Sequence, residues 1–285
     1  MSNRFLLYID ILGFSQMIEG DPRKVALVFS ILDDLNVHQH NAFKTIAFSD
    51  TILVYNPRLA TSNSSRSYYV WYLIEFAEDL QHRLTGHDVY FRAVLTEGDF
   101  SHYPLKNIEC FFGEALNRAH SKEKKIPSIG LFLDHRYSRF NRYFDLVQFD
   151  DEYDFVYLTR SLGYLQQYTG GRYPFRDRAI EDQAPHVPWQ VRFLQDVHSN
   201  MRNNPSPEIR TKHLTAWDLY ARHFPELTRI LSDNKFSLAS LGGPDAWRAE
   251  AKAMERDIKS GYRVNKSFHQ WLRLHARRRQ RLTCR

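Results

Sequence analysis

Two hydrophobic periods alternate along the first half of the chain. Apolar runs with a period of two predict strands, and apolar positions three or four residues apart predict helices. The predicted strands cover residues 4–12, 45–55, 87–100, the start of 108–125, and 129–134, with 45–55 forming two short strands that meet at 48–50. The predicted helices cover residues 21–35, 67–84, and the part of 108–125 that follows Gly113. The Ser- and Asn-rich segment 56–67 predicts a loop.

The order of these elements predicts the fold class. A β-α-β-β-α-β order is typical of an α+β domain with a ferredoxin-like core, and we assign it to residues 1–150. Residues 151–285 show a helical pattern instead, with amphipathic segments at 187–201, 206–224 and 244–258. We therefore expect a helical C-terminal extension that serves as a scaffold or an interaction surface.

Composition narrows the class of protein. Of the 285 residues, 43% are hydrophobic and 25% are charged, which is sufficient for a sizeable core. Two cysteines, Cys110 and Cys284, cannot form a disulfide framework or a thiolate metal site, as is typical of a cytoplasmic protein. The sequence contains no uncharged apolar stretch near the ~20 residues that span a bilayer, so we expect a soluble protein with no membrane partner.

The net charge of +6 suits an anionic ligand such as a nucleoside triphosphate. The one dense basic run, at residues 273–281, is interpreted as a solvated chain end in preference to a nucleic-acid contact. We expect no stable nucleic-acid partner.

Two aspartates lie in otherwise apolar segments, Asp10 in YIDILGFSQ and Asp50 in FSDTILVY. A carboxylate inside a strand is costly unless something pairs with it. In a β-α-β-β unit the first strand lies beside the following hairpin, so the two carboxylates can converge at one end of the sheet. Mg²⁺ and Mn²⁺ take oxygen ligands, often two carboxylates together with substrate phosphates.

The turn that follows Asp10 supports the same hypothesis. It passes through Gly13 into a helix, whose backbone N–H groups are suited to binding phosphates. Either aspartate alone is better explained by a structural hydrogen bond or by a salt bridge with an arginine. The two together favour a metal site and metal-assisted nucleotide chemistry.

Four segments resemble the motifs of class III nucleotide cyclases. YIDILGFS is similar to the first metal motif of that family, and FSDTILVY occupies the place of the second, with Ser49 instead of the usual glycine. FRAVLTEGDF (91–100) keeps the family's arginine and glycine, and CFFGEALNRAHSKE (110–123) keeps its glycine, asparagine, alanine and glutamate. The positions kept are Arg92, Gly98, Gly113, Asn117, Ala119 and Glu123. The resemblance covers residues 5–134.

The resemblance implies a homodimer with catalytic sites at the interface. Asp10, Asp50 and the carbonyl of Ile11 would hold two divalent metal ions, Mn²⁺ or Mg²⁺. It further implies that Asn117 of the partner subunit orients the ribose. The substrate-binding residues that we assign are Gly13, Phe14, Ser15, Ile46, Arg92 and Cys110.

Two departures from the family pattern affect the chemistry. The family's transition-state arginine falls on Ser121, and Arg118 or Lys122 is the candidate replacement, with Lys124 or Lys125 as alternatives. We assign the role to Arg118. The base-reading positions hold Ile46, which cannot hydrogen-bond a purine edge, and Cys110, which gives weak support for guanine.

One subgroup of class III cyclases fits the sequence better than the general family pattern does. The segments YIDILGF, FSD and GEAL resemble motifs of the pyrimidine cyclases of the bacterial Pycsar anti-phage systems. The implied function is conversion of UTP to 3′,5′-cyclic UMP and pyrophosphate, a second messenger that activates a separate effector. Conversion of CTP to cyclic CMP is the alternative, followed by a purine cyclase or a catalytically dead cyclase-like binding module.

Overall fold

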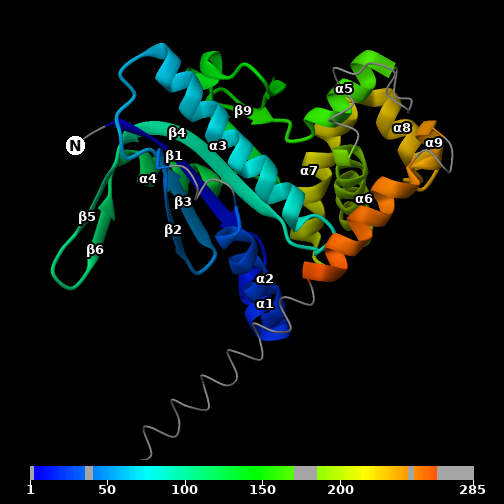
Figure 1. The fold of residues 1–285 in the computed structure, drawn as a ribbon, viewed down its shortest axis with the longest axis horizontal. Coiled ribbons are helices and arrows are strands. Elements are labelled where there is room, and N and C mark those ends of the chain that lie inside the picture. The colour runs from blue at the N-terminus through cyan, green and yellow to red at the C-terminus, as the bar shows by residue number, and fades with distance from the viewer. Residues whose placement is uncertain (1–2, 36–40, 170–184, 243–246, 262–285) are drawn as a thin grey trace, which may run out of the picture.

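The computed structural model describes residues 3–35, 41–169, 185–242 and 247–261 (Figure 1). The basic run 273–281 and Cys284 lie outside the described residues. The main sheet has seven strands in the order β2-β3-β1-β4-β7-β9-β8. Their bounds are β1 (Asn3–Ile11), β2 (Lys44–Phe48), β3 (Thr51–Tyr55), β4 (Phe91–Asp99), β7 (Gly130–Asp134), β8 (Leu146–Gln148) and β9 (Tyr153–Val156).

The helices form two groups: one alternates with the strands, and the other follows the last strand. Those of the first group are α1 (Phe14–Gly20), α2 (Pro22–Asp33), α3 (Asn63–Leu84), α4 (Glu114–Glu123) and the 3₁₀ helix η2 (His135–Phe140). Those of the second are α5 (Arg160–Thr169), α6 (Val187–Asn203), α7 (Pro207–His223), α8 (Pro225–Asp233) and α9 (Ala239–Gly242), and residues 248–261 are also helical. A separate ribbon of β5 (Ser101–Pro104) and β6 (Glu109–Phe112) extends away from the sheet (Figure 1).

The pairing of strands gives two interleaved β-α-β units. β1 is antiparallel to β3 on one side and to β4 on the other, and β2 is antiparallel to β3. β1 and β2 are therefore parallel with β3 between them, and β3 and β4 are parallel with β1 between them. This split arrangement is the ferredoxin-like one, so the predicted α+β class and ferredoxin-like core are confirmed.

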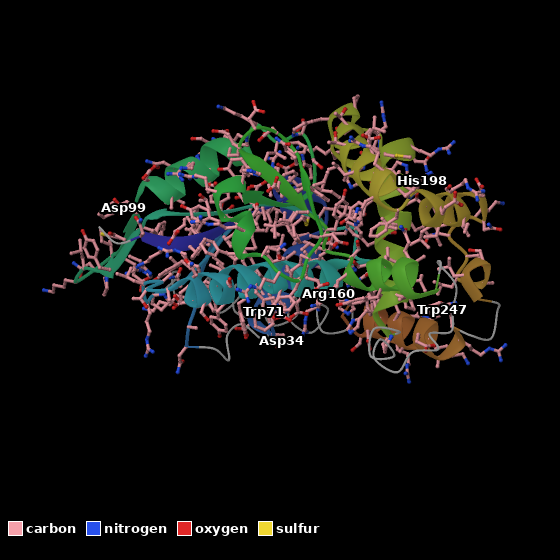
Figure 2. All side chains as sticks on the ribbon, turned by 90° about the horizontal axis from the view of Figure 1, so that it is seen from above. Asp34, Trp71, Asp99, Arg160, His198 and Trp247 are labelled. Atoms are coloured by element: carbon pink, nitrogen blue, oxygen red, sulfur yellow. The ribbon has the colours of Figure 1, made fainter. Side chains whose placement is uncertain are left out.

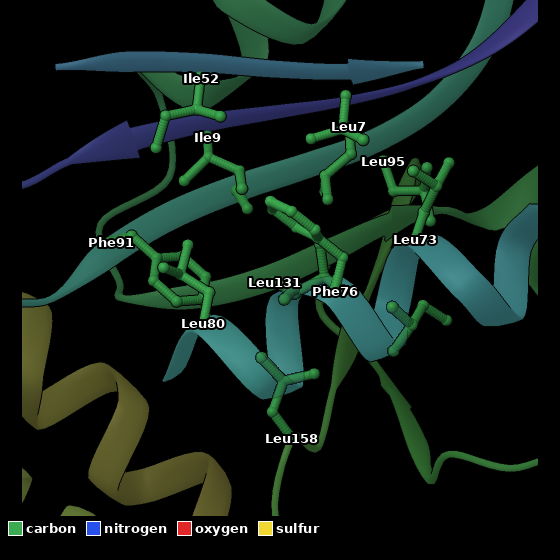
Figure 3. Close-up of a cluster of buried hydrophobic side chains, with 14 of the residues drawn as sticks. Leu7, Ile9, Ile52, Leu73, Phe76, Leu80, Phe91, Leu95, Leu131 and Leu158 are labelled. Atoms are coloured by element: carbon green, nitrogen blue, oxygen red, sulfur yellow. The ribbon is translucent and has the colours of Figure 1, made fainter. Parts of the chain in front are cut away.

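The alternation of side chains along β1 divides the core into two layers. Leu7 and Ile9 face one way, in a cluster that also holds α2 and α3 residues such as Leu73 and Phe76 (Figure 3). Leu6 faces the other way, in a cluster that holds residues of α4 and of the C-terminal helices. Since side chains alternate with a period of two, the even-numbered Asp10 belongs to the α4 side of the sheet.

Some predicted boundaries were wrong, for local reasons. The predicted loop 56–67 includes the first turn of α3, which begins at Asn63 because Ser62 and Ser65 form a reciprocal capping box. The predicted strand 87–100 begins only at Phe91, after a turn in which Asp88 has a φ of +55°. Small polar residues that look like a loop are also good helix starts.

The main sheet runs past the predicted division at residue 150, because β9 pairs with β7. The assignment of 1–150 and 151–285 to two domains stays a prediction. The two parts pack closely: the Tyr157 hydroxyl donates to the Leu219 carbonyl at 3.0 Å, and Phe155 packs edge-on against Tyr220. The predicted helices 187–201 and 206–224 correspond to α6 and α7, and the predicted helix 244–258 is helical from residue 248 onward.

Gly113 joins the β5–β6 ribbon to α4 with a φ of +151°. A Cβ atom there would overlap the backbone carbonyl of Asp99, which cannot move without shifting the end of β4. We predict that Gly113→Ala lowers the free energy of unfolding by at least about 2 kcal/mol, from strain and overpacking together. Gly20→Ala is the control, since a Cβ there meets nothing within 4 Å. Urea denaturation of both variants measures the difference, and equal stabilities would contradict this reading of Gly113.

Candidate functional site

Asp10 lies near the end of β1, between two neighbouring strands. It is opposite Thr51 of β3 and opposite Arg92 of β4. Its side chain is 21% exposed, so most of the carboxylate is removed from water although it sits at the edge of the core. The strand register therefore fixes Asp10 in a partly desolvated position.

Asp50 reaches the same place from the β2–β3 hairpin. The hairpin turn has Ser49 in the left-handed conformation, with a φ of +54°, which explains why the resembled family favours glycine at this position. The backbone carbonyl of Asp50 accepts a hydrogen bond from the Ile11 N–H at 2.9 Å. The predicted pair of strands meeting at residues 48–50 is confirmed, and the structure brings Asp50 beside Asp10.

The two carboxylates influence each other electrostatically. Burial raises the pKa of Asp10, and the negative charge of Asp50 raises that pKa further. The positive charges of Arg92, Lys212 and His120 lower the pKa of Asp10, but by less. Like charges that converge in a partly desolvated place are stabilised by a cation between them.

Within the described residues, no group of three or more His, Cys, Asp or Glu side chains is arranged to hold a metal ion. Two carboxylates are fewer ligands than Zn²⁺ or Ca²⁺ sites usually have, but they suit Mg²⁺ or Mn²⁺, which keep water or take substrate phosphates as further ligands. Asp10 and Asp50 thus fit the predicted metal ions. The part assigned to the Ile11 carbonyl stays a prediction.

Arg92 is engaged by protein groups. Its Nε donates to the Glu123 carboxylate at 2.5 Å, its Nη1 donates to the Ile126 carbonyl at 2.6 Å, and its Nη2 also donates to Glu123. Asp10 Oδ2 is 4.0 Å from the same Nη2. Arg92 is therefore placed as a counter-ion that positions Asp10, and its assigned contact with substrate stays a prediction.

The turn after Asp10 has the predicted backbone shape. Gly13 has a φ of +72° and begins α1, and among the described residues no side chain caps this helix start. Ser15 is exposed, whereas the side chain of Phe14 is buried and packs edge-on against Phe29 at 6.1 Å. Phe14 therefore contributes at most its backbone N–H to a phosphate.

Asn117 and Arg118 lie on α4 but point differently. Asn117 is exposed on the helix surface, where a second subunit can reach it. Arg118 binds Glu114, and its Nη1 lies 3.4 Å from Thr96 Oγ1 and 3.6 Å from Asp134 Oδ2. Thr96 is four positions further along β4 than Arg92, roughly 13 Å away. Within one subunit, Arg118 is thus turned away from Asp10, and its assigned catalytic role stays a prediction.

The two base-reading positions lie on different elements. Ile46 on β2 is partly buried and packs against the core layer that includes α4, and Cys110 on β6 is partly exposed. Neither side chain offers a strong hydrogen-bonding group, and their assigned contacts with substrate stay predictions.

Glu123 and Lys212 contribute to this site, yet nothing local in the sequence assigns them a role. Glu123 appears in the sequence only as part of the resemblance to the cyclase family, and its pairing with Arg92 requires the β4–α4 crossover. Lys212 belongs to α7 of the C-terminal extension, and no motif marks it.

Comparison with known proteins gives distant likenesses only. No model of a protein family matches the sequence, and no curated protein matches it. Among solved structures, the chain is similar to the adenylyl cyclase CyaB from P. aeruginosa, with 10% identity, a TM-score of 0.38, and coverage of 54% of this chain and 93% of that one. It is also similar to the monomeric guanylyl cyclase domain of the RhoGC fusion protein from the aquatic fungus Blastocladiella emersonii, with 14% identity, a TM-score of 0.44, and coverage of 55% and 95%. A third likeness is to the guanylyl cyclase Cya2, with 15% identity, a TM-score of 0.38, and coverage of 54% and 90%. At these levels of sequence identity and TM-score, the chemistry has to be argued from the residues of the site.

The described helices include none that combines the length and the apolar character needed to cross a membrane.

A separate cavity of about 400 Å³ lies between α3, α5 and α6. Glu78 lines it and is 3.3 Å from Nη2 of Arg160, which Figure 2 shows where α5 meets α3. His82 and Trp189 also line it, with ring centroids 4.5 Å apart. Burial raises the pKa of Glu78 to about 7, and burial lowers the pKa of His82 to about 4. The polar groups of this cavity are distinct from those around Asp10.

The raised pKa of Glu78 makes stability depend on pH. Because the folded protein holds this proton up to about pH 7 and the unfolded chain releases it near 4.5, stability is lost as pH rises between these values. We predict that Glu78→Gln is more stable than the wild type at pH 8, by on the order of 2 kcal/mol, and that the gain disappears below pH 4.5. Thermal unfolding from pH 4 to pH 8 measures both. A variant less stable than the wild type at pH 8 would show that the ion pair with Arg160 dominates.

Proposed function

We propose that this protein is a nucleotide cyclase that forms a 3′,5′-cyclic nucleoside monophosphate and pyrophosphate from a nucleoside triphosphate. The observation that carries the proposal is the convergence of Asp10 and Asp50 at the end of β1 beside the Gly13 turn, where the Ile11–Asp50 backbone hydrogen bond holds them. This arrangement supports the binding of a triphosphate together with divalent ions.

In this proposal Asp10 and Asp50 hold the two metal ions, Mn²⁺ or Mg²⁺. When bound, such ions polarise phosphate oxygens and make a hydroxyl easier to deprotonate. The backbone N–H groups from Gly13 to Ser15 bind the triphosphate and orient it. Arg92, tied to Glu123, keeps the Asp10 carboxylate aimed at the site.

The reaction is an in-line displacement at the α-phosphorus. The ribose 3′-oxygen forms a bond to that phosphorus and loses its proton, and the bond from the α-phosphorus to the bridging oxygen breaks, so that pyrophosphate leaves. Asn117 of the partner subunit positions the ribose, which makes the homodimer necessary for activity.

We propose a pyrimidine substrate, with UTP preferred and CTP as the alternative. The resemblance to the pyrimidine cyclase subgroup supports this choice, and the side chain of Ile46 cannot hydrogen-bond a purine edge. The same resemblance supports a cytoplasmic alarm signal in anti-phage defence that reaches a separate effector through the cyclic nucleotide. A purine cyclase is the next alternative.

A cyclase-like binding module without activity is the alternative from another class. It is favoured by Ser121 at the place of the family's arginine and by the orientation of Arg118 toward Asp134. Incubation with each of the four nucleoside triphosphates and Mn²⁺ separates these possibilities. We expect cyclic UMP or cyclic CMP together with pyrophosphate, and no cyclic product from any of the four would contradict the proposed enzyme.

We predict that Asp50→Asn lowers cyclase activity at least about 100-fold, because several kcal/mol of charge stabilisation are lost with the metal ions. Asp151→Asn is the matched control, since Asp151 is exposed on a loop between β8 and β9. Product formation at saturating Mn²⁺ measures both, and circular dichroism checks that both variants are folded. Full activity in Asp50→Asn would refute the metal assignment.

The proposed interface site predicts complementation between two inactive variants. Asp10→Asn and Asn117→Ala are each inactive alone, but a mixed dimer contains one site with both natural residues. After co-refolding in equal amounts we expect about a quarter of the wild-type activity, because half of the dimers are mixed and each has one complete site. No recovery from a mixture that is shown to contain mixed dimers would mean that Asp10 and Asn117 act within one subunit or that Asn117 has no role.

A further inference from the structure

The proposed reaction is aided by a basic side chain at the departing pyrophosphate, and the two candidates on α4, Arg118 and Lys122, are already engaged. Arg118 binds Glu114 and faces Asp134. Lys122 binds Asp150 at 2.7 Å and Glu152 at 3.0 Å. Each would have to break buried or paired contacts to reach a phosphate in its own subunit.

The C-terminal extension holds a different cation, Lys212, and Tyr90 joins this extension to the segment that follows Asp10. The Tyr90 carbonyl accepts a hydrogen bond from the Leu12 N–H at 2.9 Å, two residues after Asp10. The Tyr90 hydroxyl accepts a hydrogen bond from Asn200 Nδ2 of α6 at 2.9 Å. The Tyr90 ring packs edge-on against the buried His213 of α7 at 4.7 Å.

Lys212 is the residue next to His213 on this anchored helix, and only 18% of its side chain is exposed. His213 contacts Tyr90, whose carbonyl is hydrogen-bonded to Leu12, so the turn of α7 that holds Lys212 is anchored beside the end of β1. The first turns of α7 therefore lie beside the Asp10–Arg92 end of the sheet.

The ammonium group of Lys212 can leave its present partner, Glu208, at little cost in free energy. It binds Glu208 at 2.7 Å, one helical turn away, and the Glu208 side chain is 78% exposed. A pair of this spacing whose acidic partner is exposed to solvent adds little to stability. A triphosphate bound between Asp10 and the Gly13 turn carries more negative charge than Glu208 does.

We propose that Lys212 binds the β- and γ-phosphates of the substrate held by Asp10 and Asp50 of its own subunit, so that the C-terminal extension completes the catalytic site. The proposal rests on the proposed cyclase function. Lys212 would donate hydrogen bonds to the pyrophosphate oxygens as their charge grows, the role for which the sequence offers no aligned arginine.

The test compares nucleotide binding and turnover in Lys212→Gln, Lys212→Arg and Glu208→Gln. The binding probe is α,β-methylene UTP, which cannot be cyclised, measured by calorimetry with Mn²⁺, and UMP is the probe without β- and γ-phosphates. Lys259→Gln is the matched control, because Lys259 also pairs with a glutamate one turn away, Glu255, but is 72% exposed.

We expect Lys212→Gln to weaken binding of the triphosphate analogue by about 10- to 100-fold, the range for a hydrogen bond between charged groups, and to leave UMP binding unchanged. Lys212→Arg and Lys259→Gln should stay within about 3-fold of the wild type, since both keep a cation at position 212. Glu208→Gln should bind the analogue as tightly as the wild type or more tightly, because it releases Lys212.

The opposite effects of Lys212→Gln and Glu208→Gln separate this role from a structural one. If both variants weaken analogue binding equally, the pair only stabilises α7 and the proposal is overturned. It is also overturned if the wild type cyclises a nucleotide and Lys212→Gln does so with unchanged kcat and KM. A wild type that cyclises no nucleoside triphosphate would instead defeat the proposed function itself.

Discussion

The register of β1 between β3 and β4 is the constraint on which the site depends. In this register Asp10 lies opposite Thr51 and Arg92, and the next residue, Ile11, donates its N–H to the Asp50 carbonyl. A shift of one residue would turn Asp10 into the layer of Leu7 and Ile9 and would move those side chains into the opposite core layer, where they do not match their neighbours. The same apolar packing that stabilises the sheet therefore fixes the spacing of the two carboxylates (Figure 3).

The charges around Asp10 and Asp50 do not neutralise the pair completely. The buried guanidinium of Arg92 has Glu123 as its closest partner, which leaves Asp10 incompletely neutralised at 4.0 Å. The result is a carboxylate whose pKa is raised by burial and by Asp50. Such a pair is unfavourable without a cation, and it is therefore hard to explain as a structural feature alone. The surrounding groups suit a site that is completed by metal ions and an anionic substrate.

The sequence was sufficient for the order of the elements and for the convergence of Asp10 and Asp50, because both follow from local hydrophobic periods and from the short hairpin between β2 and β3. The sequence could not show that Arg92 pairs with Glu123 or that Arg118 points toward Asp134. Those contacts depend on how α4 crosses the sheet. Lys212 is separated from Asp10 by most of the chain, and only the anchoring of α6 and α7 on Tyr90 brings it near. The start of α3 was missed because Ser62 and Ser65 are equally common in loops and in helix caps.

Joint binding of divalent metal by Asp10 and Asp50 underlies the proposed chemistry. The most direct measurement is a Mn²⁺ titration followed by electron paramagnetic resonance, in the presence of a non-cyclisable triphosphate analogue, on the wild type and on Asp10→Asn. We expect the wild type to bind Mn²⁺ with the analogue and Asp10→Asn to lose this binding while remaining folded. Equal Mn²⁺ binding by the two folded proteins would contradict shared metal binding by Asp10 and Asp50.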